Sequence, residues 1–180
     1  KRLRKMVEET LELSKLESSE AFNKNKKISI SDLVMESWQT LKPLAEKKDI
    51  KINLLIPTKY FISADIENLK RAFINILDNA IRYSPANEEI QIEIFKRDSS
   101  VVIRVRDKGI GLEENESNDI FSRFYRGDPS RTKFKKSGSG LGLSITKKII
   151  NNNKGFIKAF NHKDGGAIIE TIFPCLNEDL

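Results

Sequence analysis

The chain has 180 residues, 38% of them hydrophobic, which is enough for one compact core. Charged residues make up 32% and the formal net charge is +6, but lysines are scattered and acidic residues are nearly as many, so we expect no nucleic-acid partner. One cysteine, Cys175, excludes an intrachain disulfide and fits a reducing compartment. No apolar run approaches the length of a membrane span, and no stretch resembles a signal peptide.

The first 18 residues predict an amphipathic helix, followed by a polar linker over residues 19–27. At about 100° per residue, one broad face of this helix is mostly apolar and consists of Leu3, Met6, Val7, Thr10, Leu11 and Leu13. No strand follows that could bury this face locally, so we expect it to need a partner. Because the chain begins with Lys1 and not with Met, we also expect it to be part of a longer protein.

From Ile28 onward the chain shows an α+β pattern. Alternating apolar residues predict strands at about 28–30, 50–56, 89–96, 100–107, 156–161 and 167–173. Apolar residues at helical spacing predict helices at about 31–48, 66–83 and 140–152, the first two capped by Ser31 and Asp65. Neighbouring strands joined by short turns favour a mostly antiparallel sheet with the helices on one side.

The predicted helix at 66–83 carries two stripes. Its core stripe is apolar and consists of Leu69, Phe73, Ile76, Leu77 and Ala80. A polar stripe beside it consists of Asn68, Asn75, Asn79 and Arg82, whereas Arg71 and Asp78 are expected to face water. An Asn carbonyl is a hard oxygen ligand that suits Mg²⁺ near phosphates. Taken alone, the polar stripe is also what a half-exposed helix without a ligand would carry.

Two chain segments end in groups that suit a nucleotide base. Pro85 ends the helix and leaves the Tyr83 ring at its lip, available for stacking. A predicted strand ends at Asp107, whose carboxylate can accept a hydrogen bond from an adenine amino group. Gly109 and Gly111 follow it and allow a tight turn and the close approach of a flat ligand. The alternative is a strand that ends in a glycine turn without a ligand.

A second glycine cluster, SGSGLGL at 137–143, leads straight into the helix at 140–152. Such a loop presents backbone N–H groups, and the helix N-terminus adds the positive end of its dipole, so both suit phosphate. The cluster matches neither a Walker P-loop nor a dinucleotide-binding fingerprint. An ordinary entry loop to a helix remains the alternative.

A long irregular loop at 112–137 separates the two glycine clusters. It contains several Lys residues and the aromatic residues Phe121, Phe124 and Tyr125, which could pin it to the domain. Arg123 or Arg126 could reach a phosphate. This composition predicts a lid over a nucleotide, the alternative being a disordered basic loop.

Four motifs, taken in chain order, resemble the boxes of the catalytic ATP-binding domain of sensor histidine kinases. NILDNAIRYS resembles the N box, DKGIGL the first glycine box, FSRFYR the F box and GSGLGL the second glycine box. GGAIIETIFP resembles the closing strand of the family, and the first 18 residues resemble the end of the second helix of its dimerisation and phosphotransfer domain. The resemblance implies a two-layer α/β sandwich with a mixed, mostly antiparallel sheet under three helices. It divides the chain into a helix end at 1–22, a linker at 23–27, a catalytic domain at 28–176 and a tail at 177–180.

The resemblance also implies roles for individual residues, position by position. Asn79 would bind Mg²⁺ with Asn75 as a catalytic residue beside it, and Asp107 would recognise the adenine amino group. Arg126 would be the catalytic arginine of the lid. The remaining ATP-binding positions are Arg82, Tyr83, Gly109, Gly111, Gly138, Gly140, Leu141, Gly142 and Leu143.

The implied activity is that of a protein-histidine kinase that uses MgATP. ATPases of the same fold activate water with a Glu where this chain has Asn75, and an amide cannot act as a general base, so transfer is favoured over hydrolysis. The only histidine, His162, lies in a predicted turn, so we expect it to be exposed and not to be the acceptor. The chain alone is therefore not expected to phosphorylate itself. The alternatives are an ATPase or serine kinase of this fold, a non-catalytic nucleotide sensor and a basic nucleic-acid-binding domain.

The partners implied by the resemblance are ATP, a histidine-bearing dimerisation domain of the same protein and the receiver domain of a response regulator. A second copy of the full-length protein would form a homodimer. The implied location is the cytoplasm, and a membrane anchor elsewhere in the full-length protein stays an open option.

Overall fold

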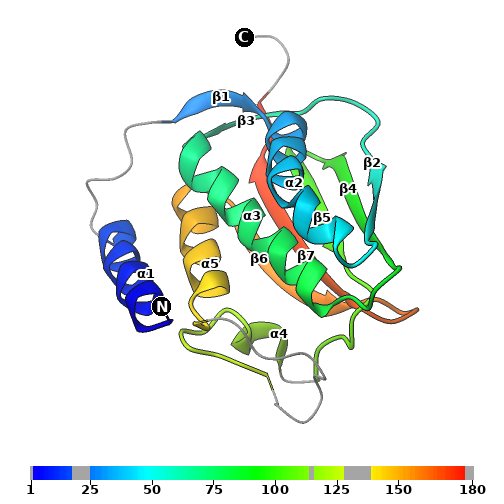
Figure 1. Cartoon of the computed structure of the whole chain (residues 1–180). Coiled ribbons are helices and arrows are strands. Elements are labelled where there is room, and N and C mark those ends of the chain that lie inside the picture. Colours follow the sequence, from blue (N-terminus) through cyan, green and yellow to red (C-terminus); the bar gives the residue numbers. More distant parts are fainter. Residues whose placement is uncertain (1, 18–24, 114–115, 128–138, 177–180) are drawn as a thin grey trace.

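The computed structural model describes residues 2–17, 25–113, 116–127 and 139–176 (Figure 1). Its elements in chain order are α1 (Arg2–Glu17), β1 (Lys26–Ser29), α2 (Ile30–Glu46), β2 (Lys51–Leu55), β3 (Phe61–Ala64), α3 (Ile66–Tyr83), β4 (Glu89–Arg97), β5 (Ser100–Arg106), α4 (Glu116–Asp119), α5 (Gly142–Asn152), β6 (Phe156–Asn161) and β7 (Ala167–Pro174). The predicted α+β fold is confirmed. Among the helices of the described ranges, none is long and apolar enough to cross a lipid bilayer.

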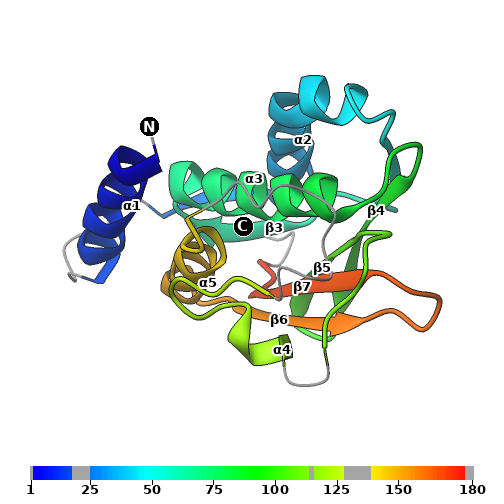
Figure 2. The same cartoon turned by 60° about the horizontal axis from the view of Figure 1, so that its bottom comes forward.

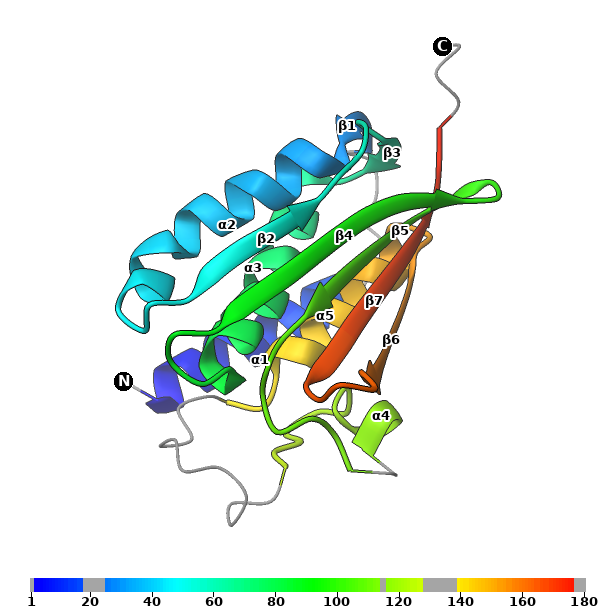
Figure 3. The ribbon, with the colours of Figure 1, turned by 90° about the vertical axis from the view of Figure 1, so that its right-hand side faces the viewer.

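Five strands form the main sheet in the order β2-β4-β5-β7-β6. β2 pairs parallel with β4, and the other neighbouring pairs are antiparallel. Helices α2, α3 and α5 cover one face of this sheet, and α1 lies beside α5 (Figures 2 and 3). In the part of the chain that the structure describes, no helix covers the opposite face, which we call the outer face (Figure 3). The predicted sandwich, a mixed, mostly antiparallel sheet under three helices, is confirmed.

The core lies between the sheet and α3. Side chains alternate along a strand, so every second residue of β4 and β5 points to the helices. These inward residues are fully or almost fully buried and include Ile90, Ile92, Ile94, Val101, Ile103 and Val105. They meet the predicted core stripe of α3, which is buried throughout. Burial of the apolar stripe thus fixes the rotation of α3 about its own axis. As a result, the polar stripe of α3 lies at the edge of the core.

Two details of the elements outside the predicted lid are wrong. The strand β3 was not predicted, because four residues are too few to show a clear alternation; it pairs with β1 in a separate two-stranded sheet. The N-cap of α2 is Ser29 and not Ser31, since the Ser29 hydroxyl accepts the N–H of Asp32 (3.3 Å). The predicted cap of α3 is confirmed: the Asp65 carboxylate accepts two N–H groups of the first turn, each at 3.1 Å.

Helix α1 buries only one edge of its predicted apolar face. Leu13 and Leu16 are buried in the common core next to α5. The Asn152 side chain of α5 donates a hydrogen bond to the Leu16 carbonyl (3.0 Å). Of the other residues of the predicted face, Met6 is half-buried and Thr10 is exposed, as is the apolar stripe of Leu3, Val7 and Leu11. The expectation that this face needs a partner therefore stands for that stripe.

A row of alternating charges crosses the outer face of the sheet. It runs from Glu93 on β4 through Arg104 and Glu170 to Lys158 on β6, because these residues are paired in register. The Glu170 side chain is fully buried, and its carboxylate contacts Arg104 (2.7 Å), Lys158 (3.1 Å) and Arg97 (3.5 Å). Burial by itself would raise the pKa of Glu170, but the hydrogen bond from Arg104 and the nearby charges of Lys158 and Arg104 outweigh it, so the pKa is lowered from 4.5.

Replacing Glu170 with Gln should lower the free energy of unfolding by about 2 kcal/mol near neutral pH, because a buried amide cannot neutralise three cations. A carboxyl whose pKa is lowered by folding stabilises the fold above its ordinary pKa and loses that contribution as the pH falls through the lowered value. The difference between wild type and Glu170→Gln should therefore shrink below about pH 4.5. Urea denaturation across this range measures it.

Glu93→Gln is the matched control, because Glu93 lies in the same row but is partly exposed and 3.7 Å from its cation. This change should lower the free energy of unfolding by less than about 1 kcal/mol. A Glu170→Gln deficit that stays constant down to acid pH would contradict an ionic role for Glu170.

Candidate functional site

Helix α3 holds the predicted polar stripe at the edge of the core. Asn75, Asn79 and Arg82 are half-buried there. The Asn75 amide donates long, weak hydrogen bonds to the Gly142 carbonyl (3.4 Å) and to the Thr146 hydroxyl (3.5 Å) at the start of α5. The stripe therefore faces the first turn of α5, where backbone N–H groups without an intrahelical partner and the positive end of the helix dipole favour an anion.

Two residues of α3 that were predicted to face water are partly buried. Burial lowers the pKa of the Arg71 guanidinium, and the charge of Glu9 on α1 opposes that shift. The Asp78 side chain is 27% exposed and accepts a hydrogen bond from Arg82 Nε one turn later (2.7 Å). The prediction failed because it ignored both the proximity of α1 to Arg71 and the ion pair between Asp78 and Arg82.

Asn79 is the residue of the stripe that could bind a metal ion. No hydrogen bond to its side chain is found within the described residues. Over the same ranges, no group of three or more His, Cys, Asp or Glu could form a metal cage. Mg²⁺ is often held by one or two protein oxygens, with substrate phosphates and waters completing its shell. The Asn79 carbonyl therefore fits Mg²⁺ together with a phosphate-bearing ligand.

The Asp107 carboxylate is held on one side and open on the other. Its Oδ1 accepts hydrogen bonds from the N–H groups of Gly109 (2.8 Å) and Ala167 (3.1 Å). Burial raises the pKa of Asp107, although these two hydrogen bonds and the charge of Arg106 oppose the shift. In the described part of the chain, no hydrogen bond reaches Oδ2. This second oxygen is thus available to accept a hydrogen bond from a ligand.

Two glycines are required by contacts within the protein itself. A Cβ on Gly109 would lie 2.8 Å from the Tyr83 carbonyl oxygen, so the loop after β5 touches the end of α3. Gly140 has a φ of +79°, and a Cβ there would lie 2.8 Å from the Phe124 backbone. Together with the contact between Asn75 and α5, these packings bring the four predicted motif segments to one end of the molecule.

The first part of the predicted lid is folded. Phe121 is buried, and the Tyr125 hydroxyl donates a short hydrogen bond to Glu116 in α4. Burial raises the pKa of Tyr125, and the bond to Glu116 adds to the shift. The Asn161 side chain of β6 binds the N–H and the carbonyl of Leu112 (2.7 and 2.8 Å). Apart from the single turn of α4, no helix or strand occurs in the described part of this loop, so the predicted irregular conformation is confirmed for most of it. The unpredicted feature is that the Asn161 side chain satisfies backbone groups of the loop.

The other predicted site residues differ in exposure. Tyr83 and Arg126 are exposed, Gly111, Gly142 and Leu143 are half-buried, and Leu141 is buried in the core. Phe124 is 53% exposed and does not pin the lid as predicted. Gly138 and the basic stretch at 128–137 lie outside the described residues, as do most of the predicted linker and the tail.

His162 lies in the turn between β6 and β7, as predicted. Its side chain is only 23% exposed, however, so the expectation of an exposed residue is wrong. The ring is turned into a pocket on the outer face of the sheet. The backbone of the turn explains this orientation, since the His162 N–H donates to Gly166 and its Nδ1 accepts the N–H of Asp164, each at 3.0 Å.

Lys48 supports the site and was not predicted. It follows α2, and its ammonium donates hydrogen bonds to the carbonyls of Ile81 (2.8 Å), Arg82 (3.1 Å) and Ser84 (2.6 Å) at the end of α3. Burial lowers the pKa of Lys48, whereas the negative end of the helix dipole favours its charge. The Ser84 hydroxyl in turn accepts the N–H of Lys108 (3.3 Å). Nothing in the local sequence distinguishes Lys48 from the other lysines, so no sequence signal could have found it.

Comparisons with known proteins identify the family and the fold of this chain. Residues 64–177 match the family described as histidine kinase-, DNA gyrase B-, and HSP90-like ATPase. Over 177 residues the chain is 32% identical to the sensor-like histidine kinase SenX3 of Mycobacterium tuberculosis, and the match covers 98% of this chain and 43% of SenX3. The chain thus spans less than half the length of that relative.

Two solved structures share the fold. Full-length ShkA in complex with AMPPNP has a TM-score of 0.82 and 22% identity, and the match covers 97% of this chain and 36% of ShkA. Histidine kinase ThkA in complex with the response regulator protein TrrA has a TM-score of 0.78 and 25% identity, and the match covers 99% of this chain and 49% of the other.

Replacing Lys48 with Met should keep the apolar stem but remove three hydrogen bonds from the end of α3. We expect a loss of about 2 kcal/mol in the free energy of unfolding. Amide exchange at Ser84, whose N–H binds the Ala80 carbonyl, should also become faster. Urea denaturation and hydrogen exchange measure the two effects. Lys47→Met removes the exposed neighbouring charge and should change stability by less than about 0.5 kcal/mol; equal unfolding midpoints for the two variants would contradict the role of Lys48.

Proposed function

Because this chain belongs to the family of histidine kinase-, DNA gyrase B- and HSP90-like ATPases, we propose that it is the ATP-binding catalytic domain of a sensor histidine kinase. It transfers the γ-phosphoryl group of MgATP to a histidine on an upstream helix, for relay to an aspartate of a response regulator. The observation that carries this proposal is the meeting of the N box, the F box and both glycine boxes. Gly109 contacts Tyr83, Gly140 contacts Phe124, and Asn75 joins the two pairs through its hydrogen bond to Gly142.

In the proposed complex, the adenine lies against the loop after β5. Oδ2 of Asp107 accepts its amino group, and the exposed Tyr83 ring offers a surface for stacking. The phosphates lie toward the first turn of α5, with Arg82 on one side and Arg126 of the lid on the other. Asn79 holds Mg²⁺, which neutralises phosphate charge during the transfer.

Asn75 favours transfer to a protein over hydrolysis. Its NH₂ group points at the Gly142 carbonyl and the Thr146 hydroxyl, so the side chain serves as a donor that joins α3 to α5. An amide has no basic site that could take a proton from water. Catalysis therefore depends on positioning and on charge neutralisation, which suffice for phosphoryl transfer to a histidine held in line.

The proposed partners follow from α1 and from the relatives. The exposed stripe of Leu3, Val7 and Leu11 would pack in a helical bundle with a second copy of the full-length protein, and the acceptor histidine would belong to that bundle. ThkA is described in complex with a response regulator protein, and we propose a partner of the same class here. We also propose a cytoplasmic location, which the proposed use of ATP supports.

Replacing Asp107 with Asn should weaken ATP binding and shift the preference toward GTP. The N–H groups of Gly109 and Ala167 need an acceptor, so the Asn carbonyl must face them and its NH₂ must face the base. That NH₂ opposes the amino group of adenine but matches the carbonyl of guanine. ATP affinity should fall at least about tenfold, or about 1.4 kcal/mol, with a smaller loss or a gain for GTP.

Calorimetric titration of both nucleotides measures the shift. Asp98→Asn, in the exposed turn between β4 and β5, is the matched control and should leave both affinities unchanged. A ratio of ATP to GTP affinity that is the same in Asp107→Asn and in wild type would show that this carboxylate does not contact the base.

This chain should bind ATP but not label itself with phosphate. Its one histidine is fixed in the β6–β7 turn, whereas transfer requires reacting atoms about 3–3.5 Å apart. Incubation with γ-labelled ATP should give no acid-labile label on this chain. A longer polypeptide that includes the upstream helix and its histidine should be labelled, and Asn79→Ala should lower that label without lowering its thermal stability.

The His162→Ala variant of this chain is the control. Efficient labelling of the chain alone that disappears in His162→Ala would overturn both the position assigned to the acceptor and the absence of a role for His162 in transfer. Acid-stable label on the longer polypeptide would instead indicate a serine-type kinase.

A further inference from the structure

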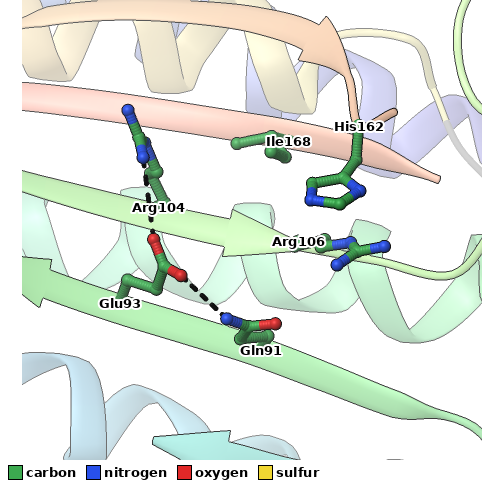
Figure 4. Close-up of a pocket in the computed structure, with 6 residues that line it drawn as sticks. All are labelled: Gln91, Glu93, Arg104, Arg106, His162 and Ile168. Carbon is green, nitrogen blue, oxygen red and sulfur yellow. Dashed lines mark hydrogen bonds and ion pairs between the residues drawn. The ribbon is translucent and has the colours of Figure 1, made fainter. Parts of the chain in front are cut away.

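A small pocket lies on the outer face of the sheet beside the β6–β7 turn (Figure 4). It is lined by Gln91, Glu93, Arg104, Arg106, His162 and Ile168. Its volume is about 90 Å³, whereas one water needs about 10–15 Å³ and pockets for larger organic ligands begin near 300 Å³. The pocket therefore has room for a small polyatomic ion and not for a nucleotide.

One wall of the pocket is neutral, because its charges compensate each other. Arg104 donates a hydrogen bond to Glu170 (2.7 Å) and lies 3.7 Å from Glu93. Gln91 donates its amide N–H to the other oxygen of Glu93 (2.8 Å). The dashed lines in Figure 4 mark the contacts of Glu93 with Arg104 and Gln91. The carboxylate of Glu93 is thus occupied, and no other residue that lines the pocket is acidic, although the Asp164 carboxylate lies 3.6 Å from Nδ1 of His162.

Arg106 has no carboxylate within ion-pair distance among the described residues. It is paired in register with Gln91 and Ile168, both uncharged. Its bond to the Gly165 carbonyl is long, at 3.5 Å, and its buried Nε has no hydrogen-bond partner over the described ranges. The neighbouring Asp107 attracts it through space, but that carboxylate binds backbone N–H groups. Most of the five donors of this guanidinium are therefore unused.

His162 supplies a second donor to the same pocket. Because its Nδ1 accepts the N–H of Asp164 (3.0 Å), the neutral ring carries its proton on Nε2. Figure 4 shows the His162 ring and the Arg106 side chain turned into the pocket, with Ile168 beside them. A guanidinium fork and a ring N–H are thus combined with an apolar wall in a space of limited size.

We propose that this pocket binds a small oxyanion of the phosphate or carboxylate class, held by the guanidinium of Arg106 and by the Nε2–H of His162. The planar fork of Arg fits two oxygens of either group, and charge-assisted hydrogen bonds of this kind are strong. The neutral wall formed by Glu93, Arg104 and Gln91 shapes the pocket without repelling the anion.

The single histidine makes the test specific, because the imidazole signals of the chain in an NMR spectrum belong to His162 alone. Titration of the whole chain with sodium phosphate, and separately with sodium acetate, at constant pH and ionic strength should shift the Hε1 signal in a saturable manner. Arg106→Gln should weaken the apparent affinity at least about tenfold. Arg97→Gln removes a charge from the same face outside the pocket and should change it less than about twofold.

Saturation by phosphate alone would assign the site to phosphate groups, and saturation by both anions would assign it to oxyanions in general. If Arg106→Gln disturbs the fold, Arg106→Lys keeps the charge without the fork and should still weaken binding about threefold or more. The proposal is overturned if neither anion gives a saturable shift beyond that of chloride. It is equally overturned if Arg97→Gln weakens binding as much as the change at Arg106.

Discussion

Two backbone N–H groups, those of Gly109 and Ala167, meet on one oxygen of the Asp107 carboxylate, and the arrangement of the site depends on this junction. Gly109 belongs to the loop after β5, whereas Ala167 begins β7, so a single side chain joins two turns that are far apart in sequence. With one oxygen occupied, the other is fixed in position and receives no hydrogen bond from the described residues, and burial raises the pKa of the carboxyl. The same side chain thus joins the loop after β5 to the start of β7 and holds an acceptor in place for adenine in the proposed site.

The end of α3 is held by Lys48, which follows α2 and is more than 30 residues away in the sequence. Three carbonyls at the end of α3 accept hydrogen bonds from the Lys48 ammonium. The Ser84 hydroxyl also accepts the N–H of Lys108, which fixes the loop after β5 to the end of α3. Tyr83 lies between these two fixed points and touches Gly109 with its carbonyl. The α2–β2 connection, α3 and the loop after β5 therefore form one unit, which positions the lip of the proposed nucleotide site.

The two faces of the sheet differ in composition and in role. The inner face is apolar and fixes α3, whereas the outer face carries the row of charges around Glu170 and, beside it, the pocket of Arg106 and His162. Arg106 directly precedes Asp107, and the turn that orients His162 leads into Ala167, which binds Asp107. An anion in the outer pocket and a nucleotide at Asp107 would thus act on opposite sides of the same short segment.

The sequence by itself determined the elements and the motif residues of this protein. Alternation along strands and helical spacing are local properties, so they placed the main strands, α2, α3 and α5 within a few residues, and the glycine, Asn and Asp motifs marked the proposed site. Only the tertiary structure decided which side chains from distant segments meet. Lys48 at the end of α3, Asn161 at Leu112 and the pairing of Arg106 with neutral neighbours depend on strand register and on how helices sit on the sheet. These contacts have no local signature, because an ordinary lysine, asparagine or arginine acquires its role only from the partner that the fold brings to it.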